Sequence, residues 1–395
     1  MTNKDAIVIV SMARTPIGNL LGELKDFSAP KMGAHVIQSA VERAHLNPAD
    51  IHEVIMGCVL PAGLGQAPAR QASIYAGIPV STPCTTINKV CGSGMKAIMF
   101  AHDLLIVGSS DIIIAGGMES MTNAPYLLTK ARQGYRLGHA ECYDHMMLDG
   151  LEDAYDKGQA MGYFAEQCAA KYGFTRQQQD DYSANSFKRA LLAIQNKCFA
   201  AEISPITHHT KQGERFIDTD EHPASVNPDK IPHLLPAFVK NGTVTAGNAS
   251  SIADGAAALV LMKSSEAEKR GLTPIARILS HASFASSSAE FTTAPIGAMQ
   301  KLMQQLNWTV NHVDLFEINE AFAVVVLAAM HDLGIPHEKI NIHGGACALG
   351  HPIGASGARI IVTLLSALKQ HHLKHGVATL CIGGGEATAI AFEMC

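Results

Sequence analysis

The sequence predicts an α/β protein made of two similar halves, with an inserted segment that covers the substrate site. Three observations support this fold class. Short β-rich runs alternate with segments of helical periodicity. The order of these segments recurs in the first and last thirds of the chain, where FSAPKMGA at 27–34 is similar to FTTAPIGA at 291–298. Residues 121–251 interrupt the pattern with stretches rich in Pro, Gly and His.

The first third of the chain carries the alternation most clearly. Apolar β-rich runs predict strands, and apolar residues at helical spacing predict helices. Strands are expected at 6–11, 54–60, 85–90 and 111–117, and helices at 31–44, 67–76 and 92–107. Such alternation implies βαβ units and a mainly parallel sheet with helices on both faces.

The last third repeats this order. Strands are expected at 313–318, 340–343 and 377–382, and helices at 295–306, 321–333 and 355–369. Residues 51–60, IHEVIMGCVL, align without a gap with residues 313–322, VDLFEINEAF. Chance similarity between two α/β segments is the alternative, but internal symmetry of this size favours two related halves.

The inserted segment contains one clear helix, at 176–195, and otherwise irregular sequence. Insertions after strands commonly cover the substrate crevice of α/β folds. The predicted organisation is an N-terminal half of residues 1–120 plus 252–273, a loop domain of residues 121–251 and a C-terminal half of residues 274–395.

Composition excludes several classes of protein. With 47% hydrophobic and 16% charged residues among 395, the chain is not intrinsically disordered, and its net charge of −5 provides no general field for nucleic acid. The apolar runs fall short of the ~18 residues of a membrane span, and the N-terminus lacks the basic and apolar regions of a secretory signal. Nine scattered cysteines without a C-x-x-C pair predict reduced thiols and a cytoplasmic protein.

Cys91 ends a β-rich run within NKVCGSGMK, residues 88–96. The glycines that follow open an apolar helix, and a helix N-terminus favours a thiolate through its dipole and free N–H groups. Cys91 is therefore a candidate nucleophile. For this motif alone, a buried structural cysteine is an equally weighted alternative.

Two further glycine-rich turns lie in the last third. GGACALGHPIGASGAR, residues 344–359, places His351 beside Pro352, and its spacing does not fit a dinucleotide-binding loop. VATLCIGGGEA, residues 377–387, places Cys381 at the end of an apolar strand, before three glycines that suit an anion-binding turn. A structural histidine and an inert cysteine at a tight turn are the alternatives.

NEAFA, residues 319–323, follows an expected strand, and its first residue aligns with Gly57 of the first half. An asparagine at a strand end can orient a water or a histidine, and Phe322 can line an apolar pocket. The alternative for Asn319 is a helix N-cap.

The motifs NKVCGSGMK, NEAFA, GHPIGASGAR and CIGGG occur together and in this order. The set resembles the thiolases, specifically the acetyl-CoA acetyltransferases of the acetoacetyl-CoA type. The resemblance covers essentially the whole chain, including DGLEDAY at 149–155 and GTVTAGNAS at 242–250. It implies a thiolase-like five-layered αβαβα fold, with two pseudo-symmetric βαβαβαββ halves and an inserted loop domain.

The resemblance also implies a role for each candidate residue. Cys91 is the nucleophile that accepts the acyl group, and His351 is its activating base and later an oxyanion donor. Cys381 is the acid/base that removes the α-proton of the second acetyl-CoA. Asn319 holds a water that completes the oxyanion hole for the enolate, and the backbone N–H groups of Cys91 and Gly383 form a second oxyanion hole.

The implied reaction is the reversible Claisen condensation of two acetyl-CoA molecules to acetoacetyl-CoA and coenzyme A, or thiolysis of 3-ketoacyl-CoA in fatty acid metabolism. A ping-pong mechanism through an acyl-Cys91 intermediate divides one difficult event into two steps. No cofactor beyond coenzyme A is expected, and neither is a metal requirement, a nucleic-acid partner or a membrane partner. The family implies a homodimer or homotetramer, and residues 127–147 are loosely similar to its tetramerisation loop.

By the same resemblance, Ser250 hydrogen-bonds the pantetheine arm of coenzyme A. The tunnel around that arm is then lined by Ala246, Met161, Leu151, Phe238 and Phe322. Acyl chain length is expected to depend on the pocket near Phe291, Phe322 and Met121.

The sequence departs from the family pattern at two positions. Biosynthetic members often have histidine where this chain has Ala160, and many members have arginine where it has Ala224. Both changes remove possible polar contacts to the nucleotide end of coenzyme A. Candidate replacements are Lys211, Arg215 and Lys230.

Three other functions stay open at this point. A β-ketoacyl synthase acts on carrier-protein thioesters, but it normally has histidine at the position of Cys381. A Cys–His–Asn hydrolase would use Cys91, His351 and Asn319, but it leaves Cys381 unexplained. A non-catalytic acyl-CoA-binding protein would bind coenzyme A without turnover.

Overall fold

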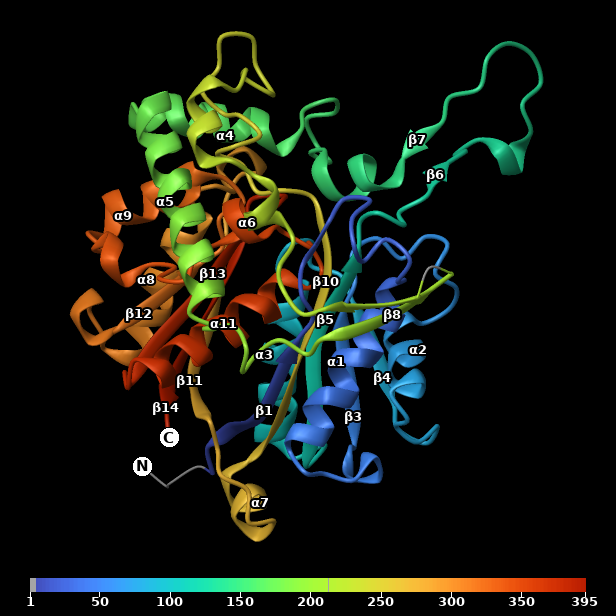
Figure 1. Ribbon diagram of the computed structural model, residues 1–395, viewed down its shortest axis with the longest axis vertical. Coiled ribbons are helices and arrows are strands. Elements are labelled where there is room, and N and C mark those ends of the chain that lie inside the picture. Colours follow the sequence, from blue (N-terminus) through green and yellow to red (C-terminus); the bar gives the residue numbers. More distant parts are fainter. Residues whose placement is uncertain (1–4, 212) are drawn as a thin grey trace.

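One mixed sheet of ten strands runs through the part of the chain that the computed structural model describes, residues 5–211 and 213–395. The first four residues of the predicted N-terminal half lie outside this description. The strand order is β12-β13-β14-β11-β1-β10-β5-β3-β4, with a short β2 (Gly18–Asn19) beside β10. In Figure 1 the blue and teal strands of the first half and the red and orange strands of the second half occupy opposite sides of the molecule.

The first half follows the predicted alternation. Its strands are β1 (Ile7–Arg14), β3 (Glu53–Gly57), β4 (Cys84–Ile87), β5 (Ile112–Ser120) and β10 (Ala253–Lys263). Its helices are α1 (Ala29–Arg43), α2 (Pro68–Tyr75), α3 (Ser93–Val107) and the short α7 (Ser264–Lys269). Prolines in the first turn begin α1 and α2, and Gly108, with φ of 78°, ends α3 in the left-handed conformation.

The second half repeats the arrangement. Its strands are β11 (Ala276–Ala285), β12 (Leu315–Ile318), β13 (His375–Ile382) and β14 (Glu386–Met394), and its helices are α8 (Ala294–Leu306), α9 (Ala323–Leu333), α10 (Ala346–Leu349) and α11 (Ser356–Gln370). In the first half β3 pairs in parallel with β4 and β5. In the second, β12 pairs in parallel with β13 and, through a single bridge, with Ile340. The predicted repeat is therefore visible in the strand pairing.

The predicted strand at 340–343 is wrong. Within the described chain, Ile340 forms only one bridge, with Phe316. Two features stop the segment from extending: Asn341 has a φ of 45°, and the guanidinium of Arg189 donates to the Ile340 carbonyl at 2.6 Å. A helix of the inserted segment thus takes the acceptor that a strand neighbour would need.

The expectation of a mainly parallel sheet is also wrong. The pairs β1–β10, β1–β11, β10–β5, β11–β14 and β13–β14 are all antiparallel. The reason lies in the last two strands of each half. A tight glycine turn links β13 to β14, and β10 returns after the inserted segment, so both run back along their neighbours.

Helices α3 and α11 pack against each other at the centre of the molecule, and each also contacts strands of both halves. Helices α1 and α2 cover the first half of the sheet on its outer side, and α8 covers the second half, with α9 packed beside it. The central helices approach closely at two glycines, where a side chain would not fit. A Cβ on Gly94 would lie 2.8 Å from the Ala358 nitrogen, and one on Gly357 would lie 2.4 Å from the Met95 nitrogen. Two sheet halves and three helical layers give the expected five-layered order.

The inserted segment contains two long helices, of which only one was predicted. Helix α5 (Arg176–Gln195) has the predicted bounds and begins at a capping box formed by Thr175 and Gln178. Helix α4 (Met161–Tyr172) was missed, because its apolar residues are mixed with small ones and its cap has no side-chain hydrogen bond. The segment also holds β6 (Tyr126–Leu127), β7 (Tyr143–Asp144), β8 (Ile206–Thr210), β9 (Gly213–Ile217), α6 (His222–Ser225) and a π-helical turn at Met147–Leu151.

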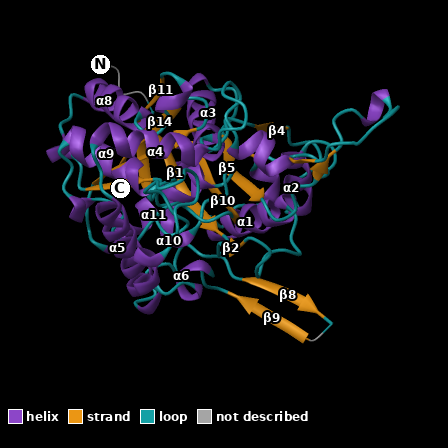
Figure 2. Cartoon of the chain, turned by 90° about the horizontal axis from the view of Figure 1, so that it is seen from above, coloured by secondary structure: helices purple, strands orange, loops and turns teal. Residues whose placement is uncertain are grey.

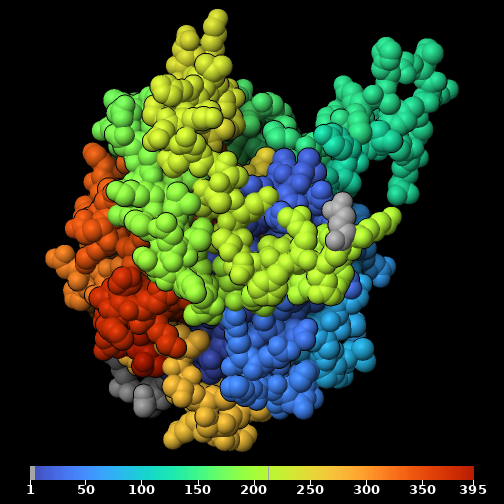
Figure 3. Space-filling model, in the orientation of Figure 1, coloured from blue at the N-terminus to red at the C-terminus, as the bar shows by residue number. Residues whose placement is uncertain are grey.

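The inserted segment lies over the boundary between the two halves. Figure 3 shows its green and yellow residues above the blue first half and beside the red second half. A hairpin arm containing β6 and β7 projects from the body, and the β8–β9 hairpin projects separately (Figures 1 and 2).

One window of the chain, Val90–Val107, is long and apolar enough to be a membrane span, contrary to the expectation from sequence. Half of this window is buried, and it contains α3, which packs against α11 and the strands around it. Its apolarity therefore matches that of a core helix.

Candidate active site

A cavity of about 420 Å³ lies where the inserted segment meets both halves. Nine residues that the sequence assigned to catalysis or to the coenzyme tunnel line it: Cys91, His351, Gly383, Ser250, Ala246, Met161, Leu151, Phe238 and Phe322. Its further lining includes Met147, Gly150, Ala160, Gly162, His222, Ala249, Ile252, Phe291 and Ile353. The wall is mostly apolar, so polar groups that face the cavity act in a poorly hydrated space.

Cys91 stands on a strained turn between β4 and α3. The residue before it, Val90, has a φ of 46°, which is rare for a β-branched side chain. The Ser93 hydroxyl closes the turn, because it donates to the Val90 carbonyl at 2.7 Å and accepts from the Lys89 N–H at 2.8 Å. This turn places Cys91 in the lining of the cavity.

The Cys91 thiol is protonated at neutral pH, which corrects the expectation of a resting thiolate. The side chain reaches the cavity surface, but protein surrounds it closely, and this burial raises its pKa to about 11. Hydrogen bonds from the backbone N–H groups of Gly383 and of Cys91 itself lower the pKa, but by less than burial raises it. Cys91 therefore needs a base at the moment of attack.

His351 is placed to be that base. Its Nδ1 lies 2.6 Å from the Ser356 hydroxyl, which in turn donates to the Pro352 carbonyl at 3.0 Å. Since the hydroxyl proton goes to that carbonyl, Nδ1 must carry the imidazole proton and Nε2 must offer a lone pair. Nε2 is buried and has no hydrogen-bond partner among the residues the structure describes.

Electrostatics keeps the imidazole neutral. Burial, and then the charge of Arg359, lower the pKa of His351 to about 3. At neutral pH the resting pair is thus a thiol beside a neutral imidazole. Transfer of the Cys91 proton to His351 before the attack is unfavourable, because it would form a thiolate–imidazolium ion pair. The proton therefore moves during the attack, when negative charge develops on a substrate oxygen that the site stabilises.

Cys381 lies near the end of β13 and is not among the described residues that line the cavity. Its side chain is fully buried, and its residue pairs with Ala387 of β14. Burial raises the pKa of Cys381 well above its usual value, and a negative charge on Cys91 raises it further, so the two sulfurs interact. Cys381 is therefore a thiol at neutral pH, because its sulfur is desolvated.

Asn319 directly follows β12, is fully buried and is likewise not among the described residues that line the cavity. Both polar atoms of its side chain are buried and without a partner in the described part of the chain. The alternative of a helix N-cap is wrong, because α9 begins after Phe322 and has no side-chain cap. An unsatisfied amide at this position is free to bind a water or an oxygen of the substrate.

The segment at 248–251 links the two catalytic regions of the second half. The Ser250 N–H donates to the Ala321 carbonyl at 2.9 Å, and the His351 N–H donates to the Ser251 carbonyl at 3.0 Å. Ala249 forms a bridge with Phe322. The loop thus holds NEAFA and His351 at a fixed separation.

Sequence reasoning missed Glu119, the buried carboxyl that ties the halves together. It accepts from the N–H groups of Val59, Leu60 and Gly354 at 2.9, 3.2 and 2.9 Å. Burial raises its pKa to about 7 although these hydrogen bonds oppose the shift. An acidic residue directly after the buried run IIIAGGM was the available signal.

Glu320 was missed in the same way. This buried carboxylate accepts from Tyr182 at 2.8 Å and from Ser186 at 2.7 Å, both on helix α5, and from the Cys347 N–H at 3.0 Å. It therefore anchors the inserted segment beside the cavity.

The basic residues considered for the nucleotide end of coenzyme A are not among the described residues that line this cavity. Lys211 and Arg215 stand beside a separate hollow at the β8–β9 hairpin, where Arg215 is paired with Glu23. Lys230 and Ala224 are exposed to solvent. Among the described residues, Met121 belongs to a buried cluster with Ile353 rather than to the lining of the cavity.

The comparisons with known proteins agree with this geometry. Family models match residues 7–265 as a thiolase N-terminal domain and residues 272–394 as a thiolase C-terminal domain. Acetyl-CoA acetyltransferase 1 of Arabidopsis thaliana is 48% identical over 98% of this chain and 94% of its own. An acetyl-CoA acetyltransferase of Escherichia coli is 49% identical over 98% of both chains. A crystal structure of an Ascaris suum thiolase in complex with coenzyme A has a TM-score of 0.93 at 41% identity, and covers 99% of this chain and 100% of that one.

Proposed function

The chain belongs to the thiolase family, and on that premise we propose that it is an acetyl-CoA acetyltransferase, which condenses two acetyl-CoA molecules to acetoacetyl-CoA and coenzyme A. One observation carries the mechanism. Cys91, His351 and Gly383 line a single apolar cavity, the Gly383 N–H bonds toward the Cys91 sulfur, and Nε2 of His351 has no partner among the described residues.

The first step is acylation of Cys91. As the sulfur attacks the thioester carbonyl, its proton moves to Nε2 of His351. The carbonyl oxygen becomes an oxyanion and accepts from the N–H groups of Gly383 and Cys91, which already bond toward the resting sulfur. Collapse of this intermediate breaks the bond to coenzyme A and leaves acetyl-Cys91.

The high pKa of Cys381 gives it a role in the same step. Because burial keeps it protonated, it is an acid that can protonate the departing coenzyme A thiolate. It is thereby left as the thiolate that removes the α-proton of the second acetyl-CoA. The enolate oxygen is stabilised by the protonated Nε2 of His351 and by a water held on Asn319.

The second step forms the carbon–carbon bond. The enolate carbon attacks acetyl-Cys91, the Cys91 sulfur leaves, and it recovers its proton from His351. Acetoacetyl-CoA departs, and both cysteines are again thiols. Every proton is thus accounted for, and the reverse sequence is thiolysis of a 3-ketoacyl-CoA.

Acylation measured by intact-protein mass spectrometry tests this assignment. With acetyl-CoA, Cys91→Ala is expected to gain no acetyl group, whereas Cys381→Ala gains one and produces no acetoacetyl-CoA. Cys84→Ala, at a thiol outside the lining of the cavity among the described residues, is the matched control and keeps full activity. An active-site acetyl group on Cys91→Ala, or acetate as the main product, would contradict the proposal.

We further propose a homodimer or homotetramer. Strand β4 is the last strand of the sheet in the described chain, and exposed apolar side chains lie near this edge, including Phe100 and Val107 of α3. The projecting arm carries the fully exposed Leu137 and the exposed Tyr126. Light scattering after size exclusion should show a dimer or tetramer, and a monomer at micromolar concentration would contradict this.

A further inference from the structure

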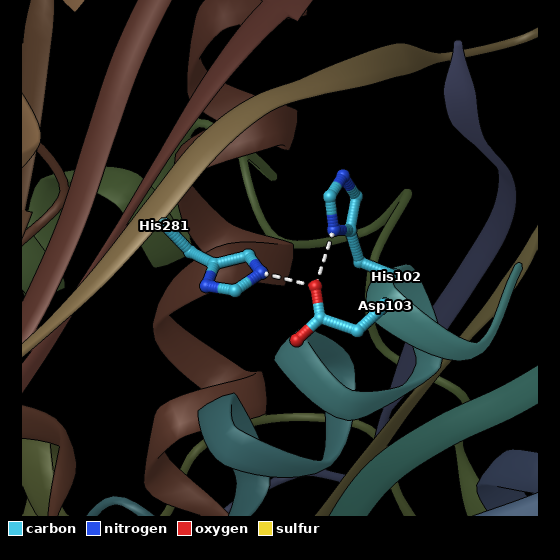
Figure 4. Close-up of side chains that lie close together, drawn as sticks. All are labelled: His102, Asp103 and His281. Atoms are coloured by element: carbon cyan, nitrogen blue, oxygen red, sulfur yellow. Dashed lines mark hydrogen bonds and ion pairs between the residues drawn. The ribbon is translucent and has the colours of Figure 1, made fainter. Parts of the chain in front are cut away.

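Two histidines and one aspartate meet where helix α3 faces strand β11 (Figure 4). His102 and Asp103 lie on α3, and His281 lies on β11. The Asp103 Oδ1 is 3.1 Å from Nδ1 of His102 and 2.9 Å from Nε2 of His281. None of the three is among the described residues that line the active-site cavity.

Two of the three separations are close to those expected of ligand atoms around one cation. All three atoms lie within 4.8 Å of one another. In tetrahedral zinc sites the metal is about 2.0–2.1 Å from nitrogen and oxygen, so neighbouring ligand atoms are about 3.3 Å apart. The two measured distances to Asp103 are a few tenths of an ångström shorter than that, and small side-chain rotations suffice to admit the ion.

The surroundings also favour a cation. The imidazoles are mostly enclosed, with 16% and 17% of their side chains exposed, and they pack edge to face at 5.0 Å. The Asp103 side chain is 54% exposed in the single chain, which leaves room for a fourth ligand.

We propose that His102, Asp103 and His281 bind one divalent first-row transition-metal ion, with Zn²⁺ as the best fit. Two imidazole nitrogens and one carboxylate oxygen suit zinc and its neighbours better than Mg²⁺ or Ca²⁺, which take oxygen ligands. Binding needs no net loss of protons from the rings, because each neutral imidazole can carry its proton on its other nitrogen. Water completes the tetrahedral shell.

Such an ion would join parts of the molecule that are otherwise in noncovalent contact. Helix α3 begins directly after the Cys91 turn, and β11 is the first strand of the second half. The metal would therefore stabilise the packing of the nucleophile's helix against the other half, without touching the reacting groups. The proposal stands independently of the enzymatic one.

Titration with Co²⁺ in place of Zn²⁺ tests the site directly. Wild-type protein is expected to bind one equivalent with the visible d–d absorption of a tetrahedral nitrogen/oxygen site. His281→Gln and Asp103→Asn each lose that equivalent, and neither reduces transferase activity. His331→Ala is the matched control, because His331 also pairs with an aspartate, Asp332, but among the described residues no third metal-ligating side chain joins that pair.

Thermal stability provides a second test of the metal site. Excess Zn²⁺ should raise the melting temperature of wild type but not of His281→Gln. Equal cobalt stoichiometry in wild type and both variants would overturn the site, as would absorption dominated by sulfur-to-cobalt charge transfer, which marks binding at the cysteines. Far-UV circular dichroism of each variant shows that it is folded, so loss of binding reports loss of a ligand.

Discussion

The two central turns of the molecule are built alike and carry different chemistry. NKVCGSG at 88–94 leads into α3, and HPIGASG at 351–357 leads into α11. The helices meet reciprocally, since Gly94 abuts Ala358 and Gly357 abuts Met95. The repeat therefore sets Asn88 against His351 and Cys91 against Gly354. One turn supplies the nucleophile and the other supplies the base.

A single missing N–H accounts for much of this difference. In the first turn, the Lys89 N–H donates to the Ser93 hydroxyl at 2.8 Å. At the equivalent place in the second turn stands Pro352, which has no N–H, and the Ser356 hydroxyl bonds Nδ1 of His351 instead. The same serine thus closes a turn in one half and orients a catalytic ring in the other.

The second turn also has no space for a second nucleophile. A Cβ on Gly354 would lie 2.5 Å from Oε2 of Glu119, the carboxylate that accepts its N–H. The site can therefore be asymmetric although its scaffold is symmetric.

Making the second turn copy the first should have the largest effect. In His351→Asn, the second turn has asparagine where the first turn has Asn88, and Cys91 loses its proton acceptor. We expect kcat to fall ~10²- to 10⁴-fold, the usual contribution of a general base. Single-turnover acetylation followed by mass spectrometry measures it. Acetylation at the wild-type rate would show that another group activates the thiol.

Glu119, which accepts from the Gly354 N–H of the second turn, should make the stability of the protein depend on pH. Its folded pKa of about 7 is above the ordinary 4.5, so the folded state binds the proton more tightly than the unfolded state. Wild type should therefore lose stability as pH rises from 4.5 to 7, by up to about 3 kcal/mol.

Glu119→Gln cannot titrate and should lose less stability over the same interval. Urea unfolding at several pH values between 4.5 and 7 provides the comparison. Parallel stability curves for the two proteins would mean that the carboxyl titrates at its ordinary pKa. The direction is specific, because a salt-bridged carboxylate would give the opposite slope.

Much of this architecture could be predicted from sequence, because it rests on local patterns. The strand–helix alternation, the helix at 176–195 and the nine cavity residues follow from periodicity, from capping and from motif resemblance. The direction of β10 and β14 and the loss of the strand at Ile340 do not, since both depend on distant partners such as Arg189. The raised pKa values of Cys91 and Cys381 could not be predicted either, because burial is a property of the assembled fold.

The two serines offer a matched pair of variants. Ser356→Ala leaves Nδ1 of His351 without its partner, so we expect about a tenfold loss in kcat, the value of one hydrogen bond to a ring that becomes charged. The pH profile of acylation should also shift. Ser93→Ala loses the hydrogen bonds that close the Cys91 turn, so it should lower the melting temperature without altering that profile. Identical pH profiles in Ser356→Ala and wild type would show that Ser356 has only a structural role.

The smallest expected effect concerns backbone strain, which only one turn carries. Val90 has a φ of 46°, whereas Ile353, its counterpart, is absent from the described residues of positive φ and is 1% exposed. Asparagine tolerates the left-handed conformation better than valine, so Val90→Asn should stabilise the protein by about 1 kcal/mol. Ile353→Asn should destabilise it, because it buries an amide in an apolar cluster. Thermal unfolding shows whether Val90→Asn stabilises the protein and Ile353→Asn destabilises it. The acylation rate shows whether the strain at Val90 contributes to activity. If Val90→Asn is more stable but acylates more slowly, the left-handed residue holds the thiol at its attacking position.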